Sequence, residues 1–184
     1  MQIRGFEPRL YQQTILHSCV KHNCLIILPT GLGKTKTAIL VAIHRLNTFP
    51  QSRVLFLTPT KPLANQICEE FKKCTDIGAS EIFLFTGAVS PEKREQDWSK
   101  SKIVVSTPQG CVNDIVNGRI SLEEISLLVF DEAHRAVGDY DYVFLAKQYM
   151  KRGKFPRIIG LTASPGSDLE KITEVSKNLF IENI

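Results

Sequence analysis

The stretch Pro29-Thr30-Gly31-Leu32-Gly33-Lys34-Thr35 decides the fold class of this chain. It lies between a short apolar run at residues 24–28 and a second apolar stretch that begins after Lys36. A glycine-rich turn that connects a buried strand to a helix directs backbone N–H groups toward an anion. Lys34 would then reach the β- and γ-phosphates of ATP, and the Thr35 hydroxyl would bind Mg²⁺.

One position departs from the general G-x-x-x-x-G-K-[ST] pattern for phosphate binding. Leu28 stands where that pattern has its first glycine. The strict pattern therefore fails, and the nature of the site depends on what the rest of the chain supplies.

The 184 residues are 43% hydrophobic and 23% charged, which is typical of one globular domain over residues 1–184. The net charge of +4 leans toward a polyanionic partner, although charge alone favours a mildly basic solvated surface as the explanation. No apolar run approaches the ~18 residues that a membrane-spanning helix needs, and the first eight residues lack the apolar core of a signal peptide. We therefore expect an intracellular protein without a membrane partner.

Strands and helices are expected to alternate after the phosphate turn. Short apolar runs typical of buried parallel strands are followed by helical patterns, and a first helix precedes the turn. The expected strands cover residues 24–28, 54–57, 82–85, 103–106, 127–130 and 158–161, and the expected helices cover 9–20, a stretch after 36, 63–73, and stretches that begin near Ser90, Pro108, Ser121 and Ser167. This alternation predicts an α/β fold with a doubly wound, mostly parallel sheet flanked by helices.

Most expected strands end in hydroxyl, glycine, proline or acidic residues. The carboxyl ends of parallel strands meet at one edge of the sheet, where ligands bind. Asp131 would hold Mg²⁺ beside Lys34 and Thr35, and Glu132 would polarise the attacking water as general base. A solvated strand exit is the alternative for an Asp-Glu pair, but the phosphate turn on the same sheet favours the catalytic interpretation.

Two side chains are ambiguous when the residues are taken alone. The carboxamide of Gln12 has a donor and an acceptor that match an adenine edge, whereas a solvated helix face is the simpler explanation. His134 follows the acidic pair, and a histidine that is hydrogen-bonded within its own loop is equally consistent with the chemistry.

Taken in order, these segments resemble the first, RecA-like lobe of a superfamily 2 helicase with a DEAH signature. The matching segments span the whole chain: Arg9-Leu10-Tyr11-Gln12, Pro29 to Thr35, Thr58 to Gln66, Thr86-Gly87, Thr107-Pro108-Gln109, Asp131-Glu132-Ala133-His134 and Thr162-Ala163-Ser164. Leu28 in place of glycine is then a mark of the helicase form of the turn. The runs 131–138 and 161–167 resemble the archaeal Hef helicases and the Fanconi anaemia M-group translocases, with Dicer and the cytosolic RNA-sensor helicases as cousins.

The resemblance implies a role for each matching residue. Arg9, Tyr11 and Gln12 would contact adenine, and the turn residues Thr30, Gly31, Leu32, Gly33, Lys34 and Thr35 would hold the phosphates and Mg²⁺. The backbone of one nucleic-acid strand would be contacted by Thr58, Pro59, Thr60, Lys61, Thr86, Gly87, Thr107, Pro108 and Gln109. His134, Thr162 and Ser164 would couple the nucleotide site to the nucleic acid.

The resemblance also implies partners outside this sequence. Enzymes of this class have a second helicase lobe whose arginines complete the ATP site, and nothing after Ser164 resembles it. We therefore expect ATP-driven work on forked or branched DNA, in the cytoplasm of an archaeon or the nucleus of a eukaryote, and weak activity from this lobe alone. A duplex-RNA sensor or a Dicer-type module is the alternative.

Overall fold

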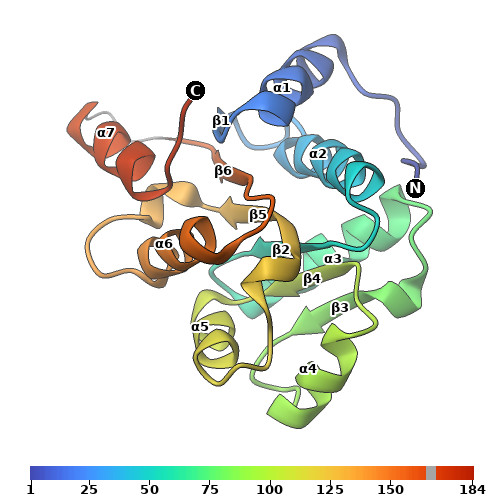
Figure 1. Ribbon diagram of the computed structural model, residues 1–184. Coiled ribbons are helices and arrows are strands. Elements are labelled where there is room, and N and C mark those ends of the chain that lie inside the picture. Colours follow the sequence, from blue (N-terminus) through green and yellow to red (C-terminus); the bar gives the residue numbers. More distant parts are fainter. Residues whose placement is uncertain (165–168) are drawn as a thin grey trace.

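The computed structural model describes residues 1–164 and 169–184. Six parallel strands form one sheet in the order β1-β6-β5-β2-β4-β3 (Figure 1). The strands are β1 (Cys24–Ile27), β2 (Arg53–Leu57), β3 (Ile82–Phe85), β4 (Ile103–Ser106), β5 (Ile125–Asp131) and β6 (Ile158–Thr162). The expected doubly wound α/β architecture is confirmed.

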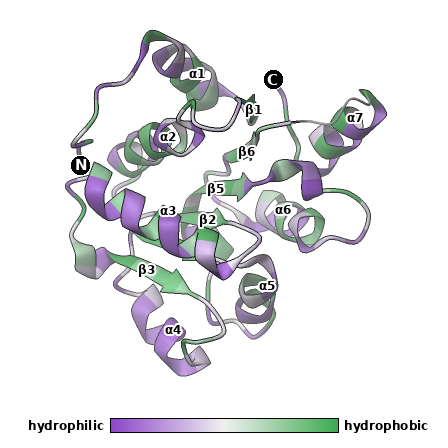
Figure 2. Ribbon diagram, turned by 180° about the vertical axis from the view of Figure 1, so that it is seen from behind, coloured by the Kyte–Doolittle hydropathy of each residue, from purple (hydrophilic) through white to green (hydrophobic). Residues whose placement is uncertain are grey.

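Helices cover both faces of the sheet. One face carries α1 (Leu10–Lys21), α2 (Lys34–Thr48) and α3 (Lys61–Cys74), and the other carries α4 (Pro91–Trp98), α5 (Pro108–Val116), α6 (Asp141–Arg152) and α7 (Leu169–Asn178). Short 3₁₀ turns lie at Ala79–Glu81, Leu122–Glu124 and Ala133–Arg135. The strands are predominantly apolar, whereas the outward sides of α3 and α4 are hydrophilic (Figure 2).

Two hydrophobic clusters form because successive strand residues point to opposite faces of the sheet. In β2, Val54 and Phe56 belong to the cluster beneath α1, α2 and α3, whereas Leu55 and Leu57 belong to the cluster beneath α5, α6 and α7. Both faces of the central strands are therefore buried, which explains why the strands read as continuous apolar runs.

The sequence analysis did not predict one helix. α6 fills the interval between Ala136 and Ile158, and it buries Tyr142, Leu145 and Tyr149. These residues recur at the i, i+3 and i+7 positions of a helix, so the sequence did carry the signal.

The remaining differences concern element boundaries. β1 ends at Ile27 and leaves Leu28 outside the strand, and α3 begins at Lys61, two residues before the expected start. Ser90 caps α4 as expected and accepts a hydrogen bond from the Lys93 N–H. The expected cap at Ser167 lies outside the described residues.

The chain returns to the outer edge of β1 near its C-terminus, where Asn183 pairs with Cys24 (Figure 1). The five cysteines are buried and free. Within residues 1–164 and 169–184, no helix has the length and apolar character needed to cross a bilayer.

Candidate active site

The turn between β1 and α2 has the backbone geometry of a phosphate-binding loop. Gly31 and Gly33 both have positive φ angles, 85° and 77°, a conformation that glycine adopts without strain. A Cβ atom at Gly33 would also lie only 2.9 Å from the Gln12 Nε2 atom. α2 begins at Lys34, so the unpaired N–H groups of its first turn face the position where phosphates would lie.

Side chains from α1 hold this turn from one side. The Tyr11 hydroxyl donates to the Leu32 carbonyl at 2.7 Å, and the Gln12 amide donates to the Gly33 carbonyl at 3.3 Å. The Gln12 carbonyl in turn accepts the Arg9 N–H at 3.0 Å. Gln12 is only 3% exposed, so in this state it supports the turn, whereas contact with adenine stays a prediction.

Lys34 is not directed at an anion in this structure. Its ammonium donates to the Leu28 carbonyl at 3.0 Å, immediately before the turn. A ligand phosphate would compete with this carbonyl for the same charge, and a charge-assisted bond to phosphate is the stronger of the two.

A cavity of about 660 Å³ opens around the turn and brings the predicted nucleotide residues together. It is lined by Phe6, Glu7, Arg9, Tyr11, Gln12, residues 30–36, Leu63, Gln66, Ile67, Glu70, Asp131 and Glu132. Every residue that the sequence assigned to nucleotide, metal or catalysis therefore borders one space.

The cavity also has a lining that sequence reasoning missed. Phe6 lies under the Lys36 ammonium, 5.1 Å from ring centroid to Nζ, and Gln66 and Glu70 reach the cavity from α3. The i, i+4 spacing of Gln66 and Glu70 places them on one face of that helix, which is the signal that the sequence offered.

Asp131 ends β5, and its environment opposes its charge. The Thr58 hydroxyl donates to its Oδ2 atom at 3.3 Å, and the Tyr142 hydroxyl donates to its backbone carbonyl at 2.7 Å. Burial, assisted by the neighbouring Glu132 carboxylate, raises the pKa of Asp131, although a hydrogen bond from the Glu132 backbone, the Thr58 bond and Lys34 oppose the shift. A divalent cation beside Asp131 would supply the missing positive charge.

Glu132 has a strained backbone, with φ 51° and ψ 49° in the left-handed region. The conformation turns the chain sharply after β5, and the 3₁₀ turn that follows packs on β6. A Cβ atom at Gly160 would lie 2.9 Å from the Ala133 Cβ atom, so this close approach requires glycine. Strain of this kind is concentrated at functional sites.

The predicted coupling residues form a connected set. His134 Nδ1 lies 3.3 Å from Glu132 Oε2 and 3.1 Å from the Thr162 hydroxyl. The Thr162 hydroxyl donates to the Ser164 carbonyl at 2.8 Å. Glu132 and the end of β6 are therefore linked through His134, whereas a coupling role for these residues stays a prediction.

The residues predicted to contact nucleic acid lie at the ends of β2, β3 and β4, and they differ in exposure. Thr60, Lys61, Gly87 and Gln109 are exposed, Pro59 and Thr107 are half-buried, and Thr58, Thr86 and Pro108 are buried. The buried threonine side chains have internal partners: Thr58 bonds to Asp131, and the Thr86 hydroxyl accepts the Ala88 N–H. The exposed members offer side chains or open backbone to a ligand, and Pro59 and Thr107 do so in part.

Comparison with known proteins identifies the family of the chain. The family model for DEAD/DEAH box helicases matches residues 9–172. The chain belongs to the DEAD/DEAH box helicase family. The solved helicase domain of Pyrococcus furiosus Hef is 52% identical, with a TM-score of 0.92 over 95% of this chain and 37% of that one.

Curated DEAD/DEAH box relatives cover the same residues. A Methanocaldococcus jannaschii protein with the provisional name of an ATP-dependent RNA helicase is 44% identical over 98% of this chain and 23% of its own. The Fanconi anemia group M protein homolog of Mus musculus is 38% identical over 96% of this chain and 9% of its own. The predicted resemblance to Hef and to the Fanconi anaemia M-group is confirmed. The chain spans less than a quarter of these two curated relatives.

Proposed function

We propose that residues 1–184 form the ATP-binding lobe of an ATP-dependent DNA helicase or translocase that acts on forked or branched DNA. One observation carries the proposal: the phosphate turn and the acidic pair border one cavity, and the exposed loop residues Thr60, Lys61, Gly87 and Gln109 lie at the same edge of the sheet. Membership of the DEAD/DEAH box family supports it.

The nucleotide site has the groups that ATP hydrolysis needs. The turn N–H groups and Lys34 would bind the phosphates, and Thr35 with Asp131 would hold Mg²⁺, which prefers a small number of oxygen ligands together with phosphates and water. Bound Mg²⁺ would neutralise charge on the β- and γ-phosphates. Glu132 would accept the proton of the attacking water, and its contact with His134 would report that step to the end of β6.

The nucleic-acid contacts would be independent of sequence. Backbone amides, hydroxyls and Lys61 bind phosphates without reading bases, and the N-termini of α3 and α5 point to the same edge of the sheet. The names of the relatives differ on the nucleic acid, since the Methanocaldococcus protein is named for RNA and a Neurospora crassa relative, 39% identical over 96% of this chain, is named for DNA. Our proposal follows the Hef and Fanconi relatives and places the protein inside the cell, in archaeal cytoplasm or a eukaryotic nucleus.

The test measures how different nucleic acids stimulate ATP hydrolysis by a protein that contains this lobe and a second helicase lobe. ATP hydrolysis should rise with forked DNA more than with single-stranded DNA or duplex RNA. The Glu132→Gln variant should bind ATP but lose about 10²- to 10⁴-fold in rate, which separates the enzyme from a contaminating ATPase. Stimulation by duplex RNA alone would favour the RNA-sensor alternative.

The second lobe has its own test. Residues 1–184 alone should hydrolyse ATP about 10³- to 10⁵-fold more slowly than the two-lobe protein, the usual contribution of an arginine finger. Equal rates would show that the lobe needs no arginine from outside.

A further inference from the structure

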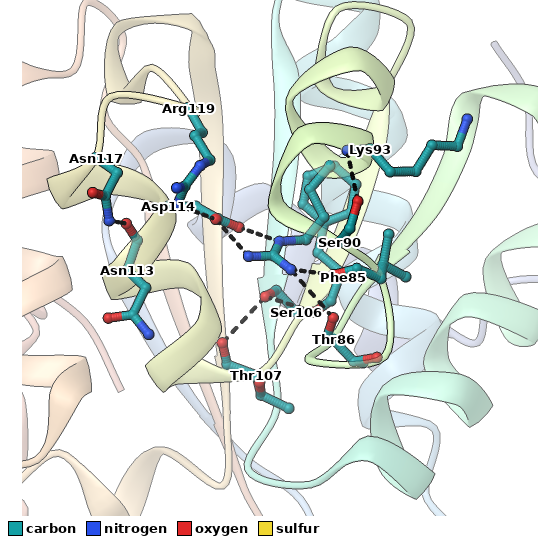
Figure 3. A network of polar contacts seen from close by, with 12 residues as sticks. Phe85, Thr86, Ser90, Lys93, Ser106, Thr107, Asn113, Asp114, Asn117 and Arg119 are labelled. Atoms are coloured by element: carbon teal, nitrogen blue, oxygen red, sulfur yellow. Dashed lines mark hydrogen bonds and ion pairs between the residues drawn. The ribbon is translucent and has the colours of Figure 1, made fainter.

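A buried ion pair joins the helix after β3 to the helix after β4 (Figure 3). Arg94, on α4, is 7% exposed, and Asp114, on α5, is 1% exposed. The Nε and Nη2 atoms of Arg94 donate to the two carboxylate oxygens of Asp114 at 2.6 and 2.7 Å. This bidentate geometry fixes both the distance and the orientation of the two side chains.

The third nitrogen of the same guanidinium holds the loop after β3. Arg94 Nη1 donates to the carbonyl of Val89 and lies 3.5 Å from the carbonyl of Thr86. Both carbonyls belong to the loop that carries Gly87, one of the exposed residues assigned to nucleic acid. Arg94 therefore connects that loop directly to α5.

A second link lies at the strand ends themselves. The Ser106 hydroxyl, at the end of β4, lies 2.9 Å from the Phe85 carbonyl and 3.1 Å from the Thr107 carbonyl. Thr107 is the N-cap of α5, and Asp114 lies about two helical turns further along the same helix. Two links thus connect these regions (Figure 3). The Ser106 hydroxyl joins the ends of β3 and β4, and the ion pair joins the loop at 86–89 to α5.

Stability alone does not account for this pair. Burying two charges removes them from water, and well-packed apolar side chains in their place are often at least as stabilising. The distinctive property of the pair is its fixed geometry, and both side chains are too deeply buried to bind a ligand themselves. The elements that it fixes are two of the three loops assigned to nucleic acid.

We propose that Arg94 and Asp114 are a positioning pair that sets the spacing between the loop of Gly87 and the N-terminus of α5. With that spacing, both elements contact the phosphate backbone of the same nucleic-acid strand. The inference rests on the proposed function, because it assigns a role to these loops only when nucleic acid binds.

The test uses Arg94→Lys in a protein with both helicase lobes. Lysine keeps the positive charge but cannot form the bidentate bond and reach the loop carbonyls together. The concentration of single-stranded DNA that gives half-maximal ATPase stimulation should rise about tenfold, while the KM for ATP and the rate without DNA stay unchanged. Asp114→Asn, which keeps the shape and one accepting oxygen, should act in the same direction and serves as a second variant if Arg94→Lys folds poorly.

Arg53→Lys is the matched control. Arg53 pairs with Glu124 through one nitrogen at 2.8 Å and donates to the carbonyls of Trp98 and Ser99 at the C-terminal end of α4, so it too is a guanidinium that joins a carboxylate to backbone carbonyls. It lies at the start of β2, at the opposite edge of the sheet from the nucleic-acid loops. Its variant should lower the melting temperature and leave half-maximal stimulation by DNA unchanged.

The outcomes distinguish a wrong positioning role from a wrong proposed function. Variants of Arg94 and Asp114 that melt at lower temperature but respond to DNA like the parent would overturn the positioning role, as would an equal shift in Arg53→Lys. A parent protein that no nucleic acid stimulates would instead overturn the proposed function. All assays are run below the lowest melting temperature of the set.

Discussion

Asp131, half-buried at the end of β5, and Asp114, buried on the helix α5, are acids in two halves of the molecule, and their surroundings differ. Asp114 lies beside β4 and has a guanidinium that matches its two oxygens. Asp131 lies at the end of β5, where the Thr58 hydroxyl, the Glu132 backbone and Lys34 do not offset its burial and the neighbouring Glu132 carboxylate. The half formed by β2, β4 and β3 is thus internally satisfied, whereas the half formed by β1, β6 and β5 retains charges that a ligand would neutralise.

The difference indicates two ways of preparing a binding surface. In the half formed by β1, β6 and β5, Lys34 bonds to a carbonyl and Glu132 has a strained backbone. A bound phosphate would replace the hydrogen bond from Lys34 to that carbonyl with a stronger, charge-assisted one. In the other half, Arg94 and Ser106 hold the loops in place before any ligand arrives. Substitutions in the two halves should therefore have opposite effects on stability.

The largest effect is expected from breaking the satisfied pair. Asp114→Ala leaves the Arg94 charge buried without its partner, and it should lower the free energy of unfolding by about 3–5 kcal/mol. The double variant Arg94→Met/Asp114→Leu should recover part of that loss, because the remaining partner of Asp114, Arg119 at 3.5 Å, is partly exposed to water. Urea denaturation of the three proteins measures both effects, and a double variant that is less stable than Asp114→Ala would contradict the explanation.

Asp131→Asn should have the opposite sign. Removing the poorly compensated charge should raise the free energy of unfolding at neutral pH by roughly 0.5–2 kcal/mol, while magnesium-dependent ATP binding is lost. Thermal denaturation and nucleotide titration with and without Mg²⁺ provide the two readouts. A loss of stability on this substitution would show that Asp131 is adequately compensated.

The same carboxyl gives a pH dependence whose sign is fixed. Because folding raises the pKa of Asp131, the folded protein binds its proton more tightly than the unfolded chain. The stabilising contribution is therefore present below the ordinary aspartate pKa and is lost as the pH rises through the raised value. The difference in unfolding free energy between Asp131→Asn and the parent should grow over that pH range.

The smallest effect is expected at the border between the halves. The Tyr142 hydroxyl donates to the Asp131 carbonyl and lies 3.3 Å from the Leu57 carbonyl, so it connects β5 to β2. Tyr142→Phe should cost about 1 kcal/mol of stability. The control is Tyr149→Phe, which removes a hydroxyl that donates to the Ile125 carbonyl and accepts the Arg157 N–H at the opposite edge of the sheet. It should lower stability without changing ATPase activity.

Much of this arrangement was predictable from the sequence, because its signals are local. The turn glycines, the apolar runs and Asp131 after β5 are read directly along the chain, and they predicted the sheet and the meeting of the phosphate turn with the acidic pair, which border one cavity. The roles of Thr58 and Thr86 illustrate the limit. A threonine at a strand end looks the same whether its hydroxyl faces solvent or Asp131.

Arg94 and Asp114 illustrate a second limit. They are twenty residues apart on an otherwise polar helix and a short helix, and nothing in either segment indicates that a charged side chain is buried. Only the packing of α4 beside α5 brings them together. Tyr142 was missed for a related reason, since α6 was not recognised and its hydroxyl has no local partner.

The left-handed backbone at Glu132 has a consequence for directed evolution. Glycine and asparagine adopt that conformation more readily than glutamate, and neither can replace its carboxylate. A selection for heat resistance alone would therefore enrich inactive proteins at this position. Libraries built on this chain need a growth or turnover requirement in every round, so that thermal tolerance is not gained by discarding the carboxylate that we propose as the catalytic base.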